Sequence, residues 1–234
     1  MSAAPAPAAA EATPVPVMAE PVTAETSRIN ASPGGATDLA PLVVAIALWI
    51  GALAVALIRP ALPADQIAAP VAAWRVAWRR YRGSALLGLV QAALVAAVLP
   101  LFGVSLASPV AAIALTGLGV LVFTAINQAL AAAFGSRAGW MLSVGLLVVQ
   151  VASLGGIVPI DTAPAVFQQL NAILPIPLLV DGLSRLSLGG SVGSVGASVT
   201  GLVLWGVLAF GVTVLAARRA QETSVARLRA ELAA

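Results

Sequence analysis

The sequence predicts an all-α fold: a polytopic membrane helix bundle of five transmembrane helices, with a short helical extracellular hairpin before the last span. Hydrophobic residues make up 60% of the chain and charged residues only 9%. Several apolar runs are about 20 residues long, the length that an α-helix needs to cross the hydrocarbon core of a bilayer. The expected spans are residues 39–58, 84–102, 109–133, 139–158 and 197–217.

Residues 1–38 precede the first expected span and are rich in Ala, Pro, Ser and Thr. They contain neither an apolar block nor a periodic pattern, so we expect a disordered, extracellular tail. They also lack the basic start and continuous apolar core of a secretory signal peptide.

The segment 71–82, with the sequence VAAWRVAWRRYR, follows the first span and a link broken by prolines. Two tryptophans four residues apart form one helical stripe, and arginines at the same spacing lie beside it. This pattern predicts an interfacial cytoplasmic helix. It fits either a membrane anchor with snorkelling arginines or a docking helix for a cytoplasmic partner. The candidate docking residues are Trp74, Arg75, Trp78, Arg79, Arg80 and Arg82.

Breaks in the second half of the chain separate the remaining spans. The pair Phe134-Gly135 predicts a tight turn between the third and fourth spans, and residues 164–188 predict two short helices. Gly155, Gly156 and Pro159 end the fourth span, either as a simple helix cap or as a hinge for the external loop. Residues 218–234 are expected to form a charged, cytoplasmic helical tail.

The distribution of arginine predicts the orientation of the bundle. With five spans, one side receives Arg59, Arg75, Arg79, Arg80, Arg82, Arg137, Arg218, Arg219, Arg227 and Arg229, and the other receives Arg28 and Arg185. We expect a multi-pass protein of the plasma membrane. Cytoplasmic loops are enriched in basic residues, so we place the arginine-rich side and the C-terminus in the cytoplasm. The N-terminus and the loop after the fourth span are then outside.

The chain contains no His and no Cys, which removes the commonest metal ligands, general bases and thiol nucleophiles. The expected spans also contain no charged residue, which disfavours a proton-coupled transporter. We therefore predict no enzyme, no cofactor and no metal site, and an intramembrane enzyme is only a distant alternative. The net charge of +3 is small, so we expect no nucleic-acid partner.

Polar side chains inside the expected spans are the remaining candidates for a functional site. They either hydrogen-bond across helices or line a substrate path. The residues are Gln91, Asn127, Gln128 and Gln150. Asn127 and Gln128 are the stronger candidates for a path, because two adjacent amides cannot both face the same neighbour.

Residues 39–217 resemble the C-terminal membrane region of the phage infection protein (Pip/YhgE) family, within the ABC-2 type permease superfamily. The matching pieces include the Asn127-Gln128 pair before Phe134-Gly135, the break GGIVP at 155–159 and LPIPLLVDGLSRLSLGG at 174–190. The resemblance implies a permease-like bundle in which the loop after the fourth span forms two short re-entrant or extracellular helices. Family members usually begin with another transmembrane helix and a long ectodomain, for which this chain has only its tail.

The resemblance leads to two expectations for function. The first is a permease-like subunit of an ABC-2-type exporter or secretion system; because the sequence has no P-loop, a separate cytoplasmic ATPase would supply the energy. The second is a non-transporting scaffold of a secretion or cell-surface complex. Expected partners are the lipid bilayer, further copies of the chain or other subunits in a homo- or hetero-oligomer, and a separate ectodomain protein.

Overall fold

The computed structural model describes residues 36–59, 62, 71–104, 107–154, 165–187 and 192–233. The tail 1–35 and the expected hinge at Gly155, Gly156 and Pro159 lie outside the described residues. Within them the structure is helical and contains no strand, which confirms the all-α class. The elements are α1 (Ala36–Ile58), α3 (Ala73–Val98), η2 (Leu99–Phe102), α4 (Pro109–Ser153), α5 (Ala165–Ile173), α6 (Pro175–Ser187), η4 (Val192–Val195) and α7 (Gly196–Ala233).

Four helical segments in the described residues are long and apolar enough to cross a membrane. They are Leu39–Ile58, Ala73–Phe102, Pro109–Ser153 and Gly193–Thr223. The count is four because α4 contains both the third and the fourth expected spans. A helix of 45 residues would be about 68 Å long if it were straight, more than twice the hydrocarbon thickness.

Helix α4 is not straight, because Gly135 has non-helical backbone angles, with φ 80° and ψ 168°. Ser143 Oγ donates a hydrogen bond to Asn127 Oδ1 across this point. Residues 16 positions apart in a straight helix would be about 24 Å apart. The chain therefore folds back at Gly135, where glycine supplies the positive φ that the predicted turn needs.

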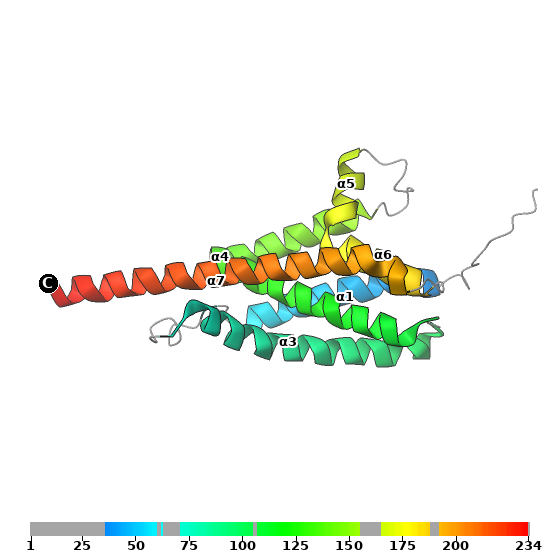
Figure 1. Ribbon diagram of the computed structural model, residues 1–234, viewed down its shortest axis with the longest axis horizontal. Coiled ribbons are helices and arrows are strands. Elements are labelled where there is room, and N and C mark those ends of the chain that lie inside the picture. The colour runs from blue at the N-terminus through cyan, green and yellow to red at the C-terminus, as the bar shows by residue number, and fades with distance from the viewer. Residues whose placement is uncertain are drawn as a thin grey trace, which may run out of the picture. The chain divides into compact units, whose positions relative to one another are not determined.

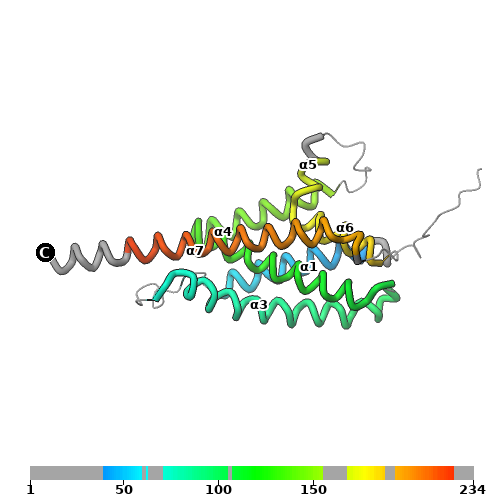
Figure 2. Tube along the Cα trace, viewed as in Figure 1, coloured from blue at the N-terminus to red at the C-terminus, as the bar shows by residue number. Residues whose placement is uncertain are grey.

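The fold-back gives the bundle two distinct ends, which can be followed in Figures 1 and 2. We call one end the arginine end; it contains the end of α1, the start of α3 and the turn of α4. Gln221 of α7 also lies there, and its Nε2 donates to the Val71 carbonyl at 2.9 Å. We call the other end the loop end; it contains the start of α1, η2 and the short helices α5 and α6.

The interior of the bundle is filled by apolar side chains. Trp49 of α1 and Phe123 of α4 are fully buried and pack edge to face, with ring centroids 5.1 Å apart. Other large apolar side chains face outward from α3 and α7, among them Leu86, Leu94 and Leu208. Exposed apolar surface along helices of this length is the surface that lipid covers.

Two segments that we expected to be separate helices are continuous with their neighbours. The expected interfacial helix 71–82 and the span that follows it form the single helix α3, and the last span continues into the C-terminal tail as α7. The pair Gly83-Ser84 contains no proline, so it does not break α3. Because Gly83 has no side chain, the guanidinium of Arg59 can lie against it; a Cβ there would be 2.8 Å from Arg59 Nη2.

Candidate functional site

The short helix α6 is a buried part of the bundle. Its buried residues are Pro175, Ile176, Pro177, Leu179, Gly182, Leu183 and Leu186. Glycines allow this packing: a Cβ on Gly119 of α4 would lie 2.6 Å from Leu179, and a Cβ on Gly182 would lie 2.6 Å from Leu115. Helix α6 is thus held between α1, α4 and α7 at the loop end.

Gln150 provides a hydrogen-bond acceptor for a backbone amide at the start of α6. The first helical amides usually lack partners, and proline at the first and third positions removes two of them. Ile176 N donates to Gln150 Oε1 at 2.9 Å, and Leu178 N donates to the Leu174 carbonyl at 3.1 Å. The Gln150 side chain is fully buried. The Pro-x-Pro step and this glutamine therefore form one unit that fixes α6 in the bundle.

The other polar side chains predicted as site residues also hydrogen-bond within the chain. Asn127 Nδ2 donates to the Phe123 carbonyl at 2.9 Å, while its Oδ1 accepts from Ser143 across the α4 turn. Gln91 of α3 donates to the Ala47 carbonyl of α1 at 2.8 Å. Gln128 donates to the Ala77 carbonyl of α3 at 3.3 Å, and its Oε1 has no partner in the described residues. Each amide thus connects different helices or arms of the hairpin.

The predicted docking residues divide into two groups on α3. Trp74, Arg75, Trp78, Arg79 and Arg82 are exposed at the arginine end, whereas Arg80 is partly buried. The Arg75 guanidinium lies 5.5 Å from the centre of the Trp74 ring, a cation–π distance. Trp78 also contacts Phe210 of α7, with ring centroids 6.1 Å apart. The exposed group forms a surface that the rest of the bundle leaves open.

Arg80 turns toward α1 and α4. It lines a cavity with Arg59, Thr124 and Gln128, and its Nη2 atom is buried without a hydrogen-bond partner in the described part of the chain. From the sequence, Arg80 was predicted to belong to the docking surface together with its exposed neighbours. Arg59 was used in the sequence prediction as one of the arginines that set the orientation, and Thr124 was not one of the candidate site residues.

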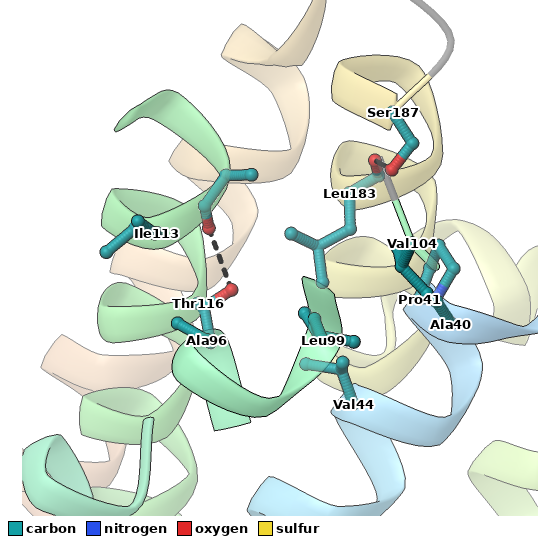
Figure 3. A pocket seen from close by; sticks show the side chains of 11 residues that line it. Ala40, Pro41, Val44, Ala96, Leu99, Val104, Ile113, Thr116, Leu183 and Ser187 are labelled. Atoms are coloured by element: carbon teal, nitrogen blue, oxygen red, sulfur yellow. Dashed lines mark hydrogen bonds between the residues drawn. The ribbon is translucent and has the colours of Figure 1, made fainter. Parts of the chain in front are cut away.

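A small apolar cavity lies at the loop end, with an enclosed volume of about 20 Å³ (Figure 3). It is lined by Ala40, Pro41, Val44, Ala96, Leu99, Val104, Ala112, Ile113, Thr116, Leu183 and Ser187. The Thr116 hydroxyl donates to the Ala112 carbonyl at 2.7 Å, so its hydrogen-bonding capacity is used within α4. No charged residue lines this cavity, which gives it the character of a packing defect or a site for an apolar group.

Asp181 and Arg185 form an ion pair on the exposed side of α6 that the sequence pattern did not single out. Arg185 Nε lies 2.9 Å from Asp181 Oδ2, which also accepts a hydrogen bond from Ser198 of α7 at 3.1 Å. The hydrogen bond to Asp181, together with its negative charge, raises the pKa of Arg185 above its ordinary value. Exposed pairs of this kind stabilise a protein only slightly, so its structural effect is to orient α6 against α7.

The apolar helices, the buried short helix and the amide side chains that hydrogen-bond between helices define a multi-pass membrane protein. The family model described as "ABC-2 family transporter protein" matches residues 2–215, and the chain belongs to that family. This confirms the superfamily predicted from the sequence, and it is a family of transport proteins.

A curated relative supports the same assignment. The chain is 26% identical over 178 residues to "Uncharacterized protein YhgE" of Bacillus subtilis (strain 168), and the match covers 76% of this chain. The chain spans only 23% of the length of that relative. No solved structure matches the chain.

Proposed function

We propose that the chain is the membrane permease subunit of an ABC-2-type exporter or secretion system, and that a separate cytoplasmic ATPase docks at its arginine end. The observation that carries this proposal is the exposed surface formed by Trp74, Arg75, Trp78, Arg79 and Arg82 of α3. Half of each tryptophan side chain is exposed, 51% for Trp74 and 49% for Trp78. Aromatic and arginine side chains are enriched at the energetic centres of protein interfaces.

The same proposal includes five membrane crossings. The fold-back of α4 at Gly135 gives two antiparallel arms, residues 109–134 with 26 residues and residues 136–153 with 18, and each is long enough to cross. With five crossings the described arginines Arg59, Arg75, Arg79, Arg80, Arg82, Arg137, Arg218 and Arg219 share the arginine end, and Arg185 stands at the loop end. This asymmetry favours a cytoplasmic arginine end.

Single cysteines test the orientation, because the natural chain has none. Gln169→Cys places an exposed thiol on α5, and Ser136→Cys places one beside the α4 turn. We expect a membrane-impermeant maleimide to label Gln169→Cys on intact cells and Ser136→Cys only after the membrane is permeabilised. The reverse pattern would invert the topology, and labelling of both positions on intact cells would contradict a single crossing between residues 136 and 169.

Charge reversal tests the docking surface. The variant with Arg75→Glu and Arg79→Glu should bind its ATPase at least about tenfold more weakly, corresponding to about 1.4 kcal/mol, because like charges replace complementary ones at the interface. Co-purification in mild detergent and stimulation of ATP hydrolysis measure the effect. The matched control reverses Arg218 and Arg219, which are exposed on α7 at the same end. Equal losses in both variants, or no loss in either, would refute docking on α3.

The filled interior favours a second candidate function, a non-transporting scaffold. Trp49 and Phe123 block the middle of the single bundle, so a substrate path would have to form between copies of the chain or between different subunits. ATP-dependent movement of cargo by the reconstituted complex supports the exporter. A complex that assembles on the chain but moves no cargo supports the scaffold.

A further inference from the structure

A polar cavity at the arginine end contains three buried atoms that lack hydrogen-bond partners in the described residues. It lies between α1, α3 and α4, and its enclosed volume is about 10 Å³. The three atoms are Arg80 Nη2, Thr124 Oγ1 and Gln128 Oε1, and all three residues line the cavity. Buried polar groups are normally paired with protein groups, ligands or ordered water, so this concentration of unpaired atoms marks a place where a polar ligand or its bound water fits.

The charge of the cavity is positive, and no carboxylate of the described residues lines it. The Arg59 guanidinium reaches α3 beside Gly83, where its charge repels that of Arg80. The ion pair found in the described side chains is Asp181–Arg185, which lies at the loop end. Two guanidinium groups, one directly after α1 and one on α3, therefore face one cavity without a carboxylate partner from the described residues. A ligand that relieves this repulsion must be an anion.

The uncharged groups restrict the ligand further. Thr124 is 3% exposed and Gln128 is 5% exposed, so neither can turn out to water. Gln128 Nε2 is held by the Ala77 carbonyl, which leaves its Oε1 free to accept a hydrogen bond. The occupants must offer oxygen acceptors to Arg80 and Thr124 and one O–H donor to Gln128. A phosphate with a bound water or a neighbouring hydroxyl supplies both.

We propose that this cavity binds the phosphate of an anionic phospholipid headgroup. The interior of the cavity has space for about one water-sized group. One phosphate oxygen, or a water that bridges to it, therefore enters the cavity. The phosphate itself lies at the mouth, between the two guanidinium groups. Arg59 directly follows the last residue of α1, which places the cavity at the depth of lipid phosphates. Basic pockets between transmembrane helices bind headgroups in this way, and the planar guanidinium suits phosphate geometry. A soluble phosphate shares this chemistry, and the proposal is independent of ATPase docking.

The test measures the thermal unfolding of the full chain in nanodiscs by its tryptophan fluorescence. Discs of phosphatidylcholine alone are compared with discs that contain phosphatidylglycerol, and a third sample adds inorganic phosphate to phosphatidylcholine discs. We expect phosphatidylglycerol to raise the Tm by roughly 3 to 6 °C at about ten times its dissociation constant, and inorganic phosphate to have no effect. A rise with inorganic phosphate alone assigns the same site to a soluble ligand and overturns the lipid assignment.

The matched pair Arg80→Gln and Arg79→Gln separates a specific site from general surface charge. Both variants remove one positive charge from α3, but only Arg80 lines the cavity. We expect the phosphatidylglycerol effect to persist in Arg79→Gln and to disappear in Arg80→Gln and in Arg59→Gln. Thr124→Val, which keeps the charge, should reduce it by about half. If Arg80→Gln does not fold, Arg59→Gln takes its place, and native mass spectrometry compares the phosphatidylglycerol that remains bound to Arg59→Gln and to Arg79→Gln. We expect only Arg79→Gln to retain the lipid. Equal effects in all variants, or no effect in the natural chain, would overturn the proposal.

Discussion

Replacing Gly139 with Ala is expected to destabilise the chain by at least about 2 kcal/mol, because it forces apart the two arms of the α4 hairpin. A Cβ at position 139 would lie 2.7 Å from Ala131 Cα and 2.7 Å from the Leu130 carbonyl oxygen. These are backbone atoms, so no side chain can rotate to relieve the contact. The expected fall in Tm is about 4 to 8 °C, and thermal unfolding of the purified protein measures it.

The control for this prediction is Gly145→Ala in the same arm. A Cβ at Gly145 meets nothing within 4 Å, and its backbone is helical. Both substitutions gain the same helix propensity, up to about 1 kcal/mol, so the difference between them isolates the contact with the facing arm. A Gly139→Ala variant as stable as Gly145→Ala would show that the arms are not packed backbone to backbone.

The hairpin also shows how much of the fold the sequence can predict. The length of the apolar runs and the Phe134-Gly135 pair identified the two arms and the turn, because a positive φ strongly favours glycine. The close approach at Gly139 could not be predicted. It depends on which faces of the arms meet, and the arms are apolar on nearly every face. The continuity of α3 was not predicted, because the Trp/Arg pattern of 71–82 and the apolar run 84–102 were interpreted as separate elements from their composition.

The candidate sites were also predicted from the sequence only in part. The spacing of Trp74 and Trp78 indicated a helical stripe, and the structure places both on one exposed face. Successive residues of a helix are separated by about 100°, so Arg79 and Arg80 face different surroundings. Which arginine turns inward is decided by Arg59, directly after α1, and by Gln128 on α4. The orphan atoms of the cavity likewise depend on the alignment of three helices, for which the sequence carries no local signal.

Replacing Gln150 with Met should loosen α6 by about 1 to 2 kcal/mol, because the Ile176 amide loses its acceptor in a dry interior. Gln150 Nε2 has no partner in the described residues, so its removal offsets part of the cost. Residues 175 and 177 are prolines without amide hydrogens, so no neighbouring helical bond can replace the lost one. Amide exchange in α6 should accelerate roughly 5- to 30-fold, and hydrogen–deuterium exchange of the peptide that contains Ile176 measures it.

The matched control for this change is Gln91→Met. Gln91 also donates a single hydrogen bond between helices, to the Ala47 carbonyl, but that carbonyl lies inside α1 and already accepts a helical bond. The same substitution therefore leaves no backbone group orphaned at Ala47, whereas it orphans the amide of Ile176. Exchange in α6 should stay unchanged in Gln91→Met. If both variants accelerate α6 equally, its position depends on general helix packing and not on the bond from Gln150. If only Gln150→Met does so, the glutamine and the Pro-x-Pro step hold the short helix in the bundle as one unit.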